Sequence, residues 1–206
     1  MNINKNNLLV TKVASKDDSR EALKCIRFTK EYTEATDGHR LVRITYPEQI
    51  KQDDLPENIK TGDAQEIKEF IIPATSTKDI KFYKGPVDFM DQAFVNVEST
   101  NANGSANFIS TDLENTSSPE IKKVESQWPA TDKVWPEGTP IFEVAVNAQY
   151  LEDLCNIAKS LDKDKRSNHP VIMRFFGPNL GITLEAKDFG VGQTMTALLM
   201  PVRMPE

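Results

Sequence analysis

The sequence predicts an α+β protein in which a unit of one strand, one helix and three further strands recurs along the chain. Two observations predict this class. Short runs of alternating apolar and polar residues, typical of half-buried strands, occur throughout the 206 residues, with apolar residues at helical spacing between them. A similar order of these elements returns after polar stretches, which indicates internal repeats. With 38% hydrophobic residues the chain can fill a core.

The C-terminal stretch shows the unit best. Apolar side chains alternate with others over residues 142–146, which predicts a strand, and Asn147 is placed to cap a helix after it. The apolar face of that helix would consist of Leu151, Leu154, Cys155, Ala158 and Leu161. Further strands are expected at residues 171–176, 180–185 and 194–200.

The earlier parts of the chain have a similar pattern. In the middle we expect strands at residues 69–73, 93–97 and 106–110, and a short helical piece within residues 75–82. At the beginning we expect a strand at residues 22–29 and two more within residues 32–44, joined by a turn at Asp37-Gly38. Residues 8–14 fit a helix or a strand equally, because their β-branched residues leave the period ambiguous.

Composition narrows the functional class. A formal net charge of −6 argues against tight non-specific binding of nucleic acid through many phosphate contacts, but it is compatible with a ring that holds DNA loosely by a basic inner face. No apolar run reaches the roughly 18 residues of a membrane span, and the N-terminus lacks the apolar stretch that drives secretion. We therefore expect a cytoplasmic protein.

Candidate groups for metal binding or catalysis are few. Cys25 and Cys155 have neither close-spaced partners nor nearby histidines, which favours buried thiols over a metal site. Asp37 and His39 suggest acid–base chemistry, but neither a nucleophile, nor metal-ligand spacing, nor a phosphate-binding glycine loop accompanies them. We expect neither an enzyme nor a cofactor.

Residues 35–41 read ATDGHRL, a run that resembles a signature in the middle domain of the bacterial DNA polymerase III beta subunit, the beta sliding clamp. Residues 20–28 resemble the strand that precedes this signature in the family. Residues 128–136, with their Trp-Pro pairs, resemble the segment that closes the middle domain. Residues 198–204 are similar to the clamp C-terminus, in which an apolar pair precedes Met-Pro-x-Arg, and residues 146–151 resemble the Asn-x-x-Tyr-Leu that opens the last half of the third domain.

This resemblance implies a DNA clamp, or processivity fold, built of repeated strand-helix-three-strand half-domains. Residues 1–118 would form a domain like the middle domain of the clamp, residues 119–137 a connector, and residues 138–206 a C-terminal half-domain. The first domain and the first half of the third domain of the family have no counterpart in this sequence. Half-domains could then complete one another in an oligomer, repack within a monomer, or serve as an adaptor that has lost the ring.

In the clamp family these motifs form a groove that receives short peptides of polymerases, the clamp loader and repair proteins. Leucines, a valine, a methionine and prolines would make an apolar slot here, edged by hydrogen-bond donors. Carried over position by position, the groove would comprise Leu23, Thr36, Gly38, His39, Arg40, Leu41, Pro129, Lys133, Val134, Gly181, Leu198, Met200 and Pro201.

Clamps also offer basic residues to the phosphates of duplex DNA, which position the duplex without reading its sequence. The corresponding candidates are Lys78, Lys81, Lys84, Lys159, Lys163, Lys165 and Arg166. The resemblance thus implies a processivity factor of DNA replication that binds polymerase and clamp-loader peptides, contacts DNA, and forms a homo-oligomer. The alternative is a peptide-binding clamp mimic or adaptor that does not encircle DNA.

Overall fold

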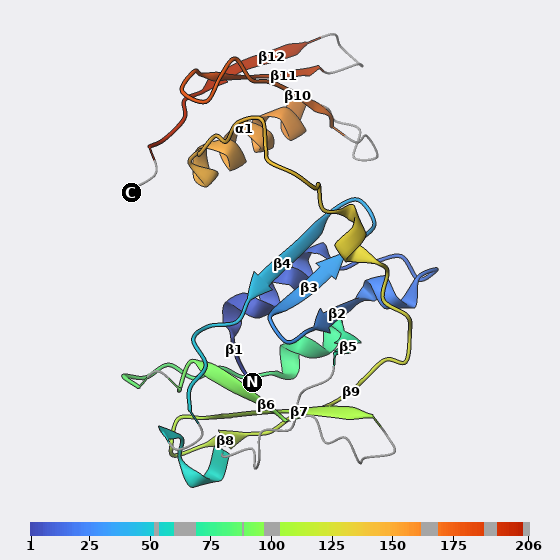
Figure 1. Ribbon diagram of the computed structural model, residues 1–206, viewed down its shortest axis with the longest axis vertical. Coiled ribbons are helices and arrows are strands. Elements are labelled where there is room, and N and C mark those ends of the chain that lie inside the picture. Colours follow the sequence, from blue (N-terminus) through green and yellow to red (C-terminus); the bar gives the residue numbers. More distant parts are fainter. Residues whose placement is uncertain are drawn as a thin grey trace. The chain divides into compact units, whose positions relative to one another are not determined.

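The computed structural model describes residues 1–51, 54–59, 69–87, 89–96, 104–161, 169–187 and 193–203. The chain divides into two compact units, Met1–Trp135 and Pro136–Glu206, each of which is described by itself. Three sheets, one α-helix and several short 3-10 helices occur in the described ranges, which confirms the predicted α+β class (Figure 1). Over the same ranges, the helices are too short or too polar to cross a bilayer.

The first unit alternates short helices with strands. Its strands are β1 (Asn2–Asn4), β2 (Cys25–Phe28), β3 (Tyr32–Thr36), β4 (Leu41–Thr45), β5 (Phe70–Pro73), β6 (Gln92–Asn96), β7 (Ser105–Thr111), β8 (Thr116–Ser117) and β9 (Glu120–Lys122). Its 3-10 helices are η1 (Lys5–Val13), η2 (Glu21–Lys24), η4 (Glu57–Ile59), η5 (Ala74–Asp79) and η6 (Thr131–Val134).

The first unit consists of two similar halves that exchange a strand. Strands β2, β3 and β4 follow η1, and strands β6, β7 and β9 follow η5, so each half has the predicted order of strand, helix and three strands. The sheets, however, run β4-β3-β2-β5 and β1-β6-β7, with β8 and β9 on the far side of β7. The first strand of each half thus completes the sheet of the other half. The antiparallel registers place Ile72 opposite Ile26 and Ile3 opposite Ala93.

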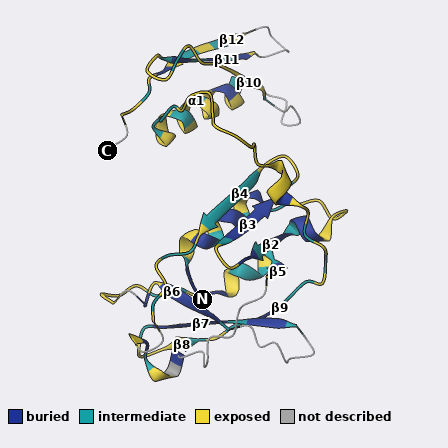
Figure 2. Ribbon diagram, viewed as in Figure 1, coloured by how far each residue is buried: buried dark blue, intermediate teal, exposed yellow. Residues whose placement is uncertain are grey.

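One hydrophobic core joins these sheets. The ring of Phe28 stacks on Phe70 with centroids 4.8 Å apart, and it also meets Phe108 of the other sheet at 5.7 Å. Figure 2 shows the buried residues gathered on the strands of both sheets. Burial of one such ring contributes roughly 1.5–3 kcal/mol, so the exchanged strands are held by packing as well as by backbone bonds.

The second unit contains the helix and the three following strands of one such half. Helix α1 (Ala148–Leu161) is followed by β10 (Val171–Arg174), β11 (Ile182–Lys187) and β12 (Thr194–Leu199), which form an antiparallel sheet in sequence order. The predicted cap of α1 is confirmed, because Asn147 Oδ1 accepts from the backbone N–H of Gln149 at 2.9 Å. Ile182, Leu184 and Leu199 form the core of this unit, against Val144, Val146, Leu151, Leu154, Val171 and Ala197.

Several local predictions need correction. Residues 142–146 are no strand: among the described residues, their one backbone hydrogen bond outside helices and strands runs from Val202 N to Ala145 O, at 2.9 Å. Cys155 is exposed on α1, so the prediction of a buried thiol is wrong there and confirmed for Cys25. Residues 8–14, left open between helix and strand, belong largely to the 3-10 helix η1. Residues 22–24 of the expected strand 22–29 instead belong to η2.

Candidate functional site

The ATDGHRL motif forms a hairpin turn between β3 and β4 that Asp37 holds in shape. Asp37 Oδ1 accepts from the backbone N–H groups of His39 at 2.9 Å and Arg40 at 2.8 Å. Its Oδ2 accepts from Arg40 Nε at 3.0 Å and Nη2 at 2.8 Å. Gly38 has a φ of 89°, a left-handed conformation in which a side chain is strained. The sequence Asp-Gly therefore fixes the turn and leaves His39 and Arg40 exposed.

The ionisation of Asp37 follows from this network. Its partial burial would by itself raise the pKa of the carboxyl group, but hydrogen bonds from the Arg40 side chain and from the His39 and Arg40 N–H groups outweigh that effect, and the pKa falls to about 2. Asp37 is therefore a carboxylate at neutral pH whose acceptor sites are already used within the turn. It acts as a structural anchor and is poorly placed to serve as a base.

A groove of about 520 Å³ lies between η2 and the segment that contains the first Trp-Pro pair. Leu23 and Pro129, both candidate peptide contacts, line it together with Trp128. Arg20 also lines it and reaches the hairpin turn, because its Nη1 lies 3.8 Å from the place where a Cβ on Gly38 would stand. The structure thus brings Leu23, Pro129 and the ATDGHRL turn to one side of the first unit.

Glu34 holds the Trp-Pro segment against the sheet of β3. Its carboxylate is fully buried, at 0% exposure, and accepts from Trp128 Nε1 at 2.6 Å and Thr131 Oγ1 at 2.8 Å. Arg27 Nη1 at 3.2 Å and Arg43 Nε at 2.5 Å balance its charge. A buried carboxylate needs such partners to remain charged. The groove wall formed by Trp128 and Pro129 therefore depends on Glu34.

Arg43 extends this network to the end of the first unit. It pairs with Asp132 at 2.5 Å, and its guanidinium carbon lies 4.5 Å from the centre of the Tyr32 ring and 5.1 Å from that of Trp135. The sequence-based reasoning missed both Glu34 and Arg43. The sequence does contain a signal for them, because β2, β3 and β4 each carry a charged residue at an inner position. The signal is not specific, since an ordinary solvated sheet face has the same pattern.

The remaining candidates of the first unit have varied surroundings. Thr36 is buried and pairs with the half-buried Leu41 across β3 and β4, on the sheet face that bears Glu34. Lys133 and Val134 are exposed in η6. Leu41 and Val134 are thus apolar side chains that a ligand could reach, whereas Thr36 supports the turn by accepting from Gly38 N at 3.1 Å.

The other candidates gather in the second unit. A Cβ on Gly181 would stand 2.6 Å from Leu198 Cδ1 and 3.2 Å from Met200 Sδ, so a larger residue there would have to displace these two side chains. Leu198 is 62% exposed and Met200 58%, which makes them an apolar surface cluster. Pro201 lines a separate cavity of about 1100 Å³ with Val144, Ala145, Val202 and others.

The candidate DNA contacts are solvated. Lys78, Lys81, Lys84 and Lys159 are all exposed, and Lys159 stands in the last turn of α1, near the exposed acids Glu152 and Asp153. Lys163, Lys165 and Arg166 lie outside the described residues. The described part of this surface is therefore mixed in charge.

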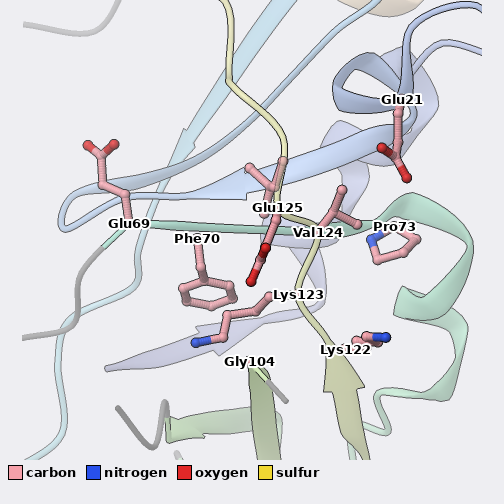
Figure 3. Close-up of a pocket in the computed structure, with 10 residues that line it drawn as sticks. Glu21, Glu69, Phe70, Pro73, Gly104, Lys122, Lys123, Val124 and Glu125 are labelled. Carbon is pink, nitrogen blue, oxygen red and sulfur yellow. The ribbon is translucent and has the colours of Figure 1, made fainter. Parts of the chain in front are cut away.

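A further cavity of about 730 Å³ lies where the two halves of the first unit meet, beside β5. Figure 3 shows Glu21 and Glu69 on opposite sides of it and Lys122 and Lys123 approaching from the β9 side. Glu69 is already bound to Arg27 at 2.6 Å. Within the described ranges, no cluster of His, Cys, Asp and Glu is arranged to hold a metal ion.

No family model matches the chain, and no curated protein matches it significantly.

Proposed function

We propose that this protein is a sliding-clamp-like processivity factor of DNA replication, which binds short clamp-binding peptides of polymerases and of the clamp loader. In this proposal it is no enzyme, and its fold is the clamp fold of repeated half-domains. The observation that carries the proposal is the Asp37-anchored ATDGHRL turn beside a groove lined by Leu23, Trp128 and Pro129.

The chemistry of this surface suits a short peptide. Leu23 and Pro129 give the groove apolar walls, Leu41 and Val134 are accessible nearby in the first unit, and Arg40 supplies hydrogen-bond donors. Each buried anchor of a peptide contributes roughly 1.5–3 kcal/mol, which gives a contact that exchanges readily. In the second unit, the Gly181, Leu198 and Met200 cluster is an apolar surface of its own that could bind an apolar side chain of a peptide.

The internal repeat also supports a clamp. The first unit has two halves that exchange their first strands, and the second unit repeats the helix and three following strands of one half. A chain of such units carries its groove and its lysine-bearing helices at separate places, so one protein can hold a peptide and contact DNA phosphates together.

Mixed charge favours a second candidate function, a peptide-binding adaptor that does not encircle DNA. The net charge is −6, and Glu152 and Asp153 are exposed on the same helix as Lys159. Such a surface binds phosphates weakly. Retention on nicked circular plasmid, compared with the same plasmid after linearisation, separates the two functions: a clamp is retained on the circle and slides off the linear form, and an adaptor is retained on neither.

The groove is tested by fluorescence anisotropy with a labelled clamp-binding peptide from a bacterial replicative polymerase. Leu41→Ala and Met200→Ala should each weaken binding roughly 5- to 30-fold, which corresponds to about 1–2 kcal/mol of lost apolar contact. Leu113→Ala and Ile157→Ala, at exposed positions of the two units outside the candidate site, are the controls and should leave binding unchanged. Equal affinity of all four variants would contradict the site.

A further inference from the structure

The second unit has the local geometry of one half of the first unit. In the first unit, β5 accepts a backbone hydrogen bond at Ile71 O from Val124 N, the residue two positions after β9, at 3.0 Å. In the second unit, Ala145 O accepts the equivalent bond from Val202 N at 2.9 Å, after β12. Val144 and Val146 contribute to the core of their unit, as Phe70 and Ile72 do in theirs. Residues 142–146 therefore stand where β5 stands.

In the first unit this place is shared with the other half. Ile72 pairs with Ile26 and Phe70 with Phe28, so β5 lies along the outer edge of β2. The second unit has the same two pieces, residues 144–146 and the outer edge of β10, but over its described residues neither has a strand beside it. In the described part of the second unit, residues 144–146 are therefore an unpaired segment that could be donated to another sheet, and the outer edge of β10 is an unpaired edge that could accept such a strand.

The free edge of residues 144–146 has its backbone groups in the right direction. The N–H and C=O of one residue in an extended strand point to the same side, and neighbouring residues alternate. In a segment extended as β5 is, the bond from Val202 N to Ala145 O would therefore turn the backbone groups of Val144 and Val146 to the opposite side. Uncovered strand edges of this kind are pairing sites for another chain.

The side chains of β10 also lack the cover that a neighbouring strand provides. Met173 lies opposite the buried Leu184, on the core side of the sheet, yet it remains 37% exposed. Ile172 is 48% exposed on the other face. The equivalent residues of β2, with β5 beside them, include Phe28 at 0% exposure.

A comparison of two cavities also indicates that the second unit lacks a second half. The 730 Å³ cavity of Figure 3 is lined by Phe70, Ile71 and Val124, and Glu21 from the other half forms one of its walls. The 1100 Å³ cavity of the second unit is lined by the equivalent Val144, Ala145 and Val202. The described residues that line it all belong to the second unit itself.

We propose that the second unit dimerises with a second copy of this chain by reciprocal strand pairing, in which residues 144–146 of each copy lie antiparallel along β10 of the other. With Met173, which lies opposite the buried Leu184, taken as the equivalent of Phe28, the register would place Val144 opposite Met173, Ala145 opposite Ile172 and Val146 opposite Val171. The exchange is two-way, as it is between β1 and β5 and their partner sheets, so two copies close around a two-fold axis and each β10 edge and each 144–146 segment is paired.

A second copy is the fitting occupant because this chain already contains both complementary pieces. A partner that offered only a strand would leave residues 144–146 unpaired, and one that offered only an edge would leave β10 bare. One C-terminal half from another copy satisfies both at once. This inference rests on the topology and is independent of the proposed peptide binding and DNA binding.

Cysteine cross-linking tests the pairing and its register. In a Cys155→Ser background, which removes the exposed native thiol, Ala145→Cys with Ile172→Cys should give an interchain disulfide on mild oxidation. Ala145 and Ile172 occupy a pair without mutual hydrogen bonds in the proposed register, in which side chains lie closest. Ala145→Cys with Arg174→Cys, displaced by two residues along β10, is the matched control and should cross-link much less.

The expected product migrates as a dimer on a non-reducing gel, and light scattering should give the unmodified protein a mass of about 46 kDa, twice the 23.2 kDa of one chain. A monomer at high micromolar concentration, an intrachain disulfide, or equal cross-linking of the control pair would each overturn the proposal. Peptide affinity measured on the same samples reports on the proposed function separately, since its groove residues Leu23 and Pro129 lie in the first unit.

Discussion

Replacement of Glu34 by glutamine should loosen the Trp-Pro segment from the first unit. The carboxylate is fully buried and accepts hydrogen bonds from Arg27, Arg43, Trp128 and Thr131. Glutamine has nearly the same shape, but it removes the charge that balances two arginines and presents an N–H₂ group to one of the donors. Removal of one partner from a buried ion pair costs about 3–5 kcal/mol, and we expect about 3 kcal/mol here because Arg27 and Arg43 retain some contact with water.

Intrinsic fluorescence is a selective assay for this change. The chain contains two tryptophans, Trp128 and Trp135, and both lie in the segment that Glu34 and Arg43 hold. Glu34→Gln should shift the tryptophan emission to longer wavelength and make Lys133 accessible to trypsin earlier. Urea unfolding followed by circular dichroism should show a lower midpoint. Peptide affinity should fall as well, because Trp128 and Pro129 form a wall of the groove.

Glu114→Gln, at an exposed position in the turn before β8, is the matched control and should change none of these readings. If Glu34→Gln has the emission maximum, trypsin sensitivity and urea midpoint of the control, then the Trp-Pro segment is held by something other than Glu34. The account of the groove wall would then be wrong.

Further predictions concern the turn, the thiols and the lysines. Gly38→Ala should destabilise the protein by about 1 kcal/mol in urea unfolding, because an alanine is strained at a φ of 89°. The pKa of Asp37 is lowered from 3.8 to about 2, so its stabilising effect should be complete above pH 4 and be lost as the pH falls towards 2, visible as an acid midpoint that Asp37→Asn removes. Ellman's reagent should modify the exposed Cys155 quickly and Cys25 only on unfolding, because burial raises the pKa of the Cys25 thiol to about 11. Lys78→Ala with Lys81→Ala should flatten the salt dependence of any DNA binding.

The sequence predicts those parts of the fold whose cause is local. The hairpin of β3 and β4 was predicted because Asp37-Gly38 determines its turn, and α1 because Asn147 caps an amphipathic run. Strands β8 and β9 were missed: they are short and are interrupted at Pro119, whose carbonyl group instead accepts from Phe108 N at 3.1 Å. A strand is recognised in a sequence by the alternation of buried and exposed residues, and β8 and β9 are too short to show this alternation.

The candidate site was predictable only in part, for a related reason. Ala35 and Glu34 are adjacent on β3 and both are fully buried, so the strand is covered on both faces. Its sequence alternates as a solvated strand would, and nothing local shows that residues about 100 positions away cover Glu34. Residues 142–146 present the converse case: the alternation predicts a strand, but the strand that would pair with them is absent from the described part of the chain.

Assembly and peptide binding depend on different units of the chain. In the first unit, the first strand of each half pairs with the sheet of the other half, so neither exchanged strand needs a partner from another chain. The second unit has one half and needs another. Two copies joined there would complete one two-half domain from their second units. Each first unit brings its own groove, so a dimer presents two grooves on one particle. A partner with two binding peptides should then bind more tightly than one with a single peptide, by a factor that disappears when the Ala145–Ile172 pairing is disrupted.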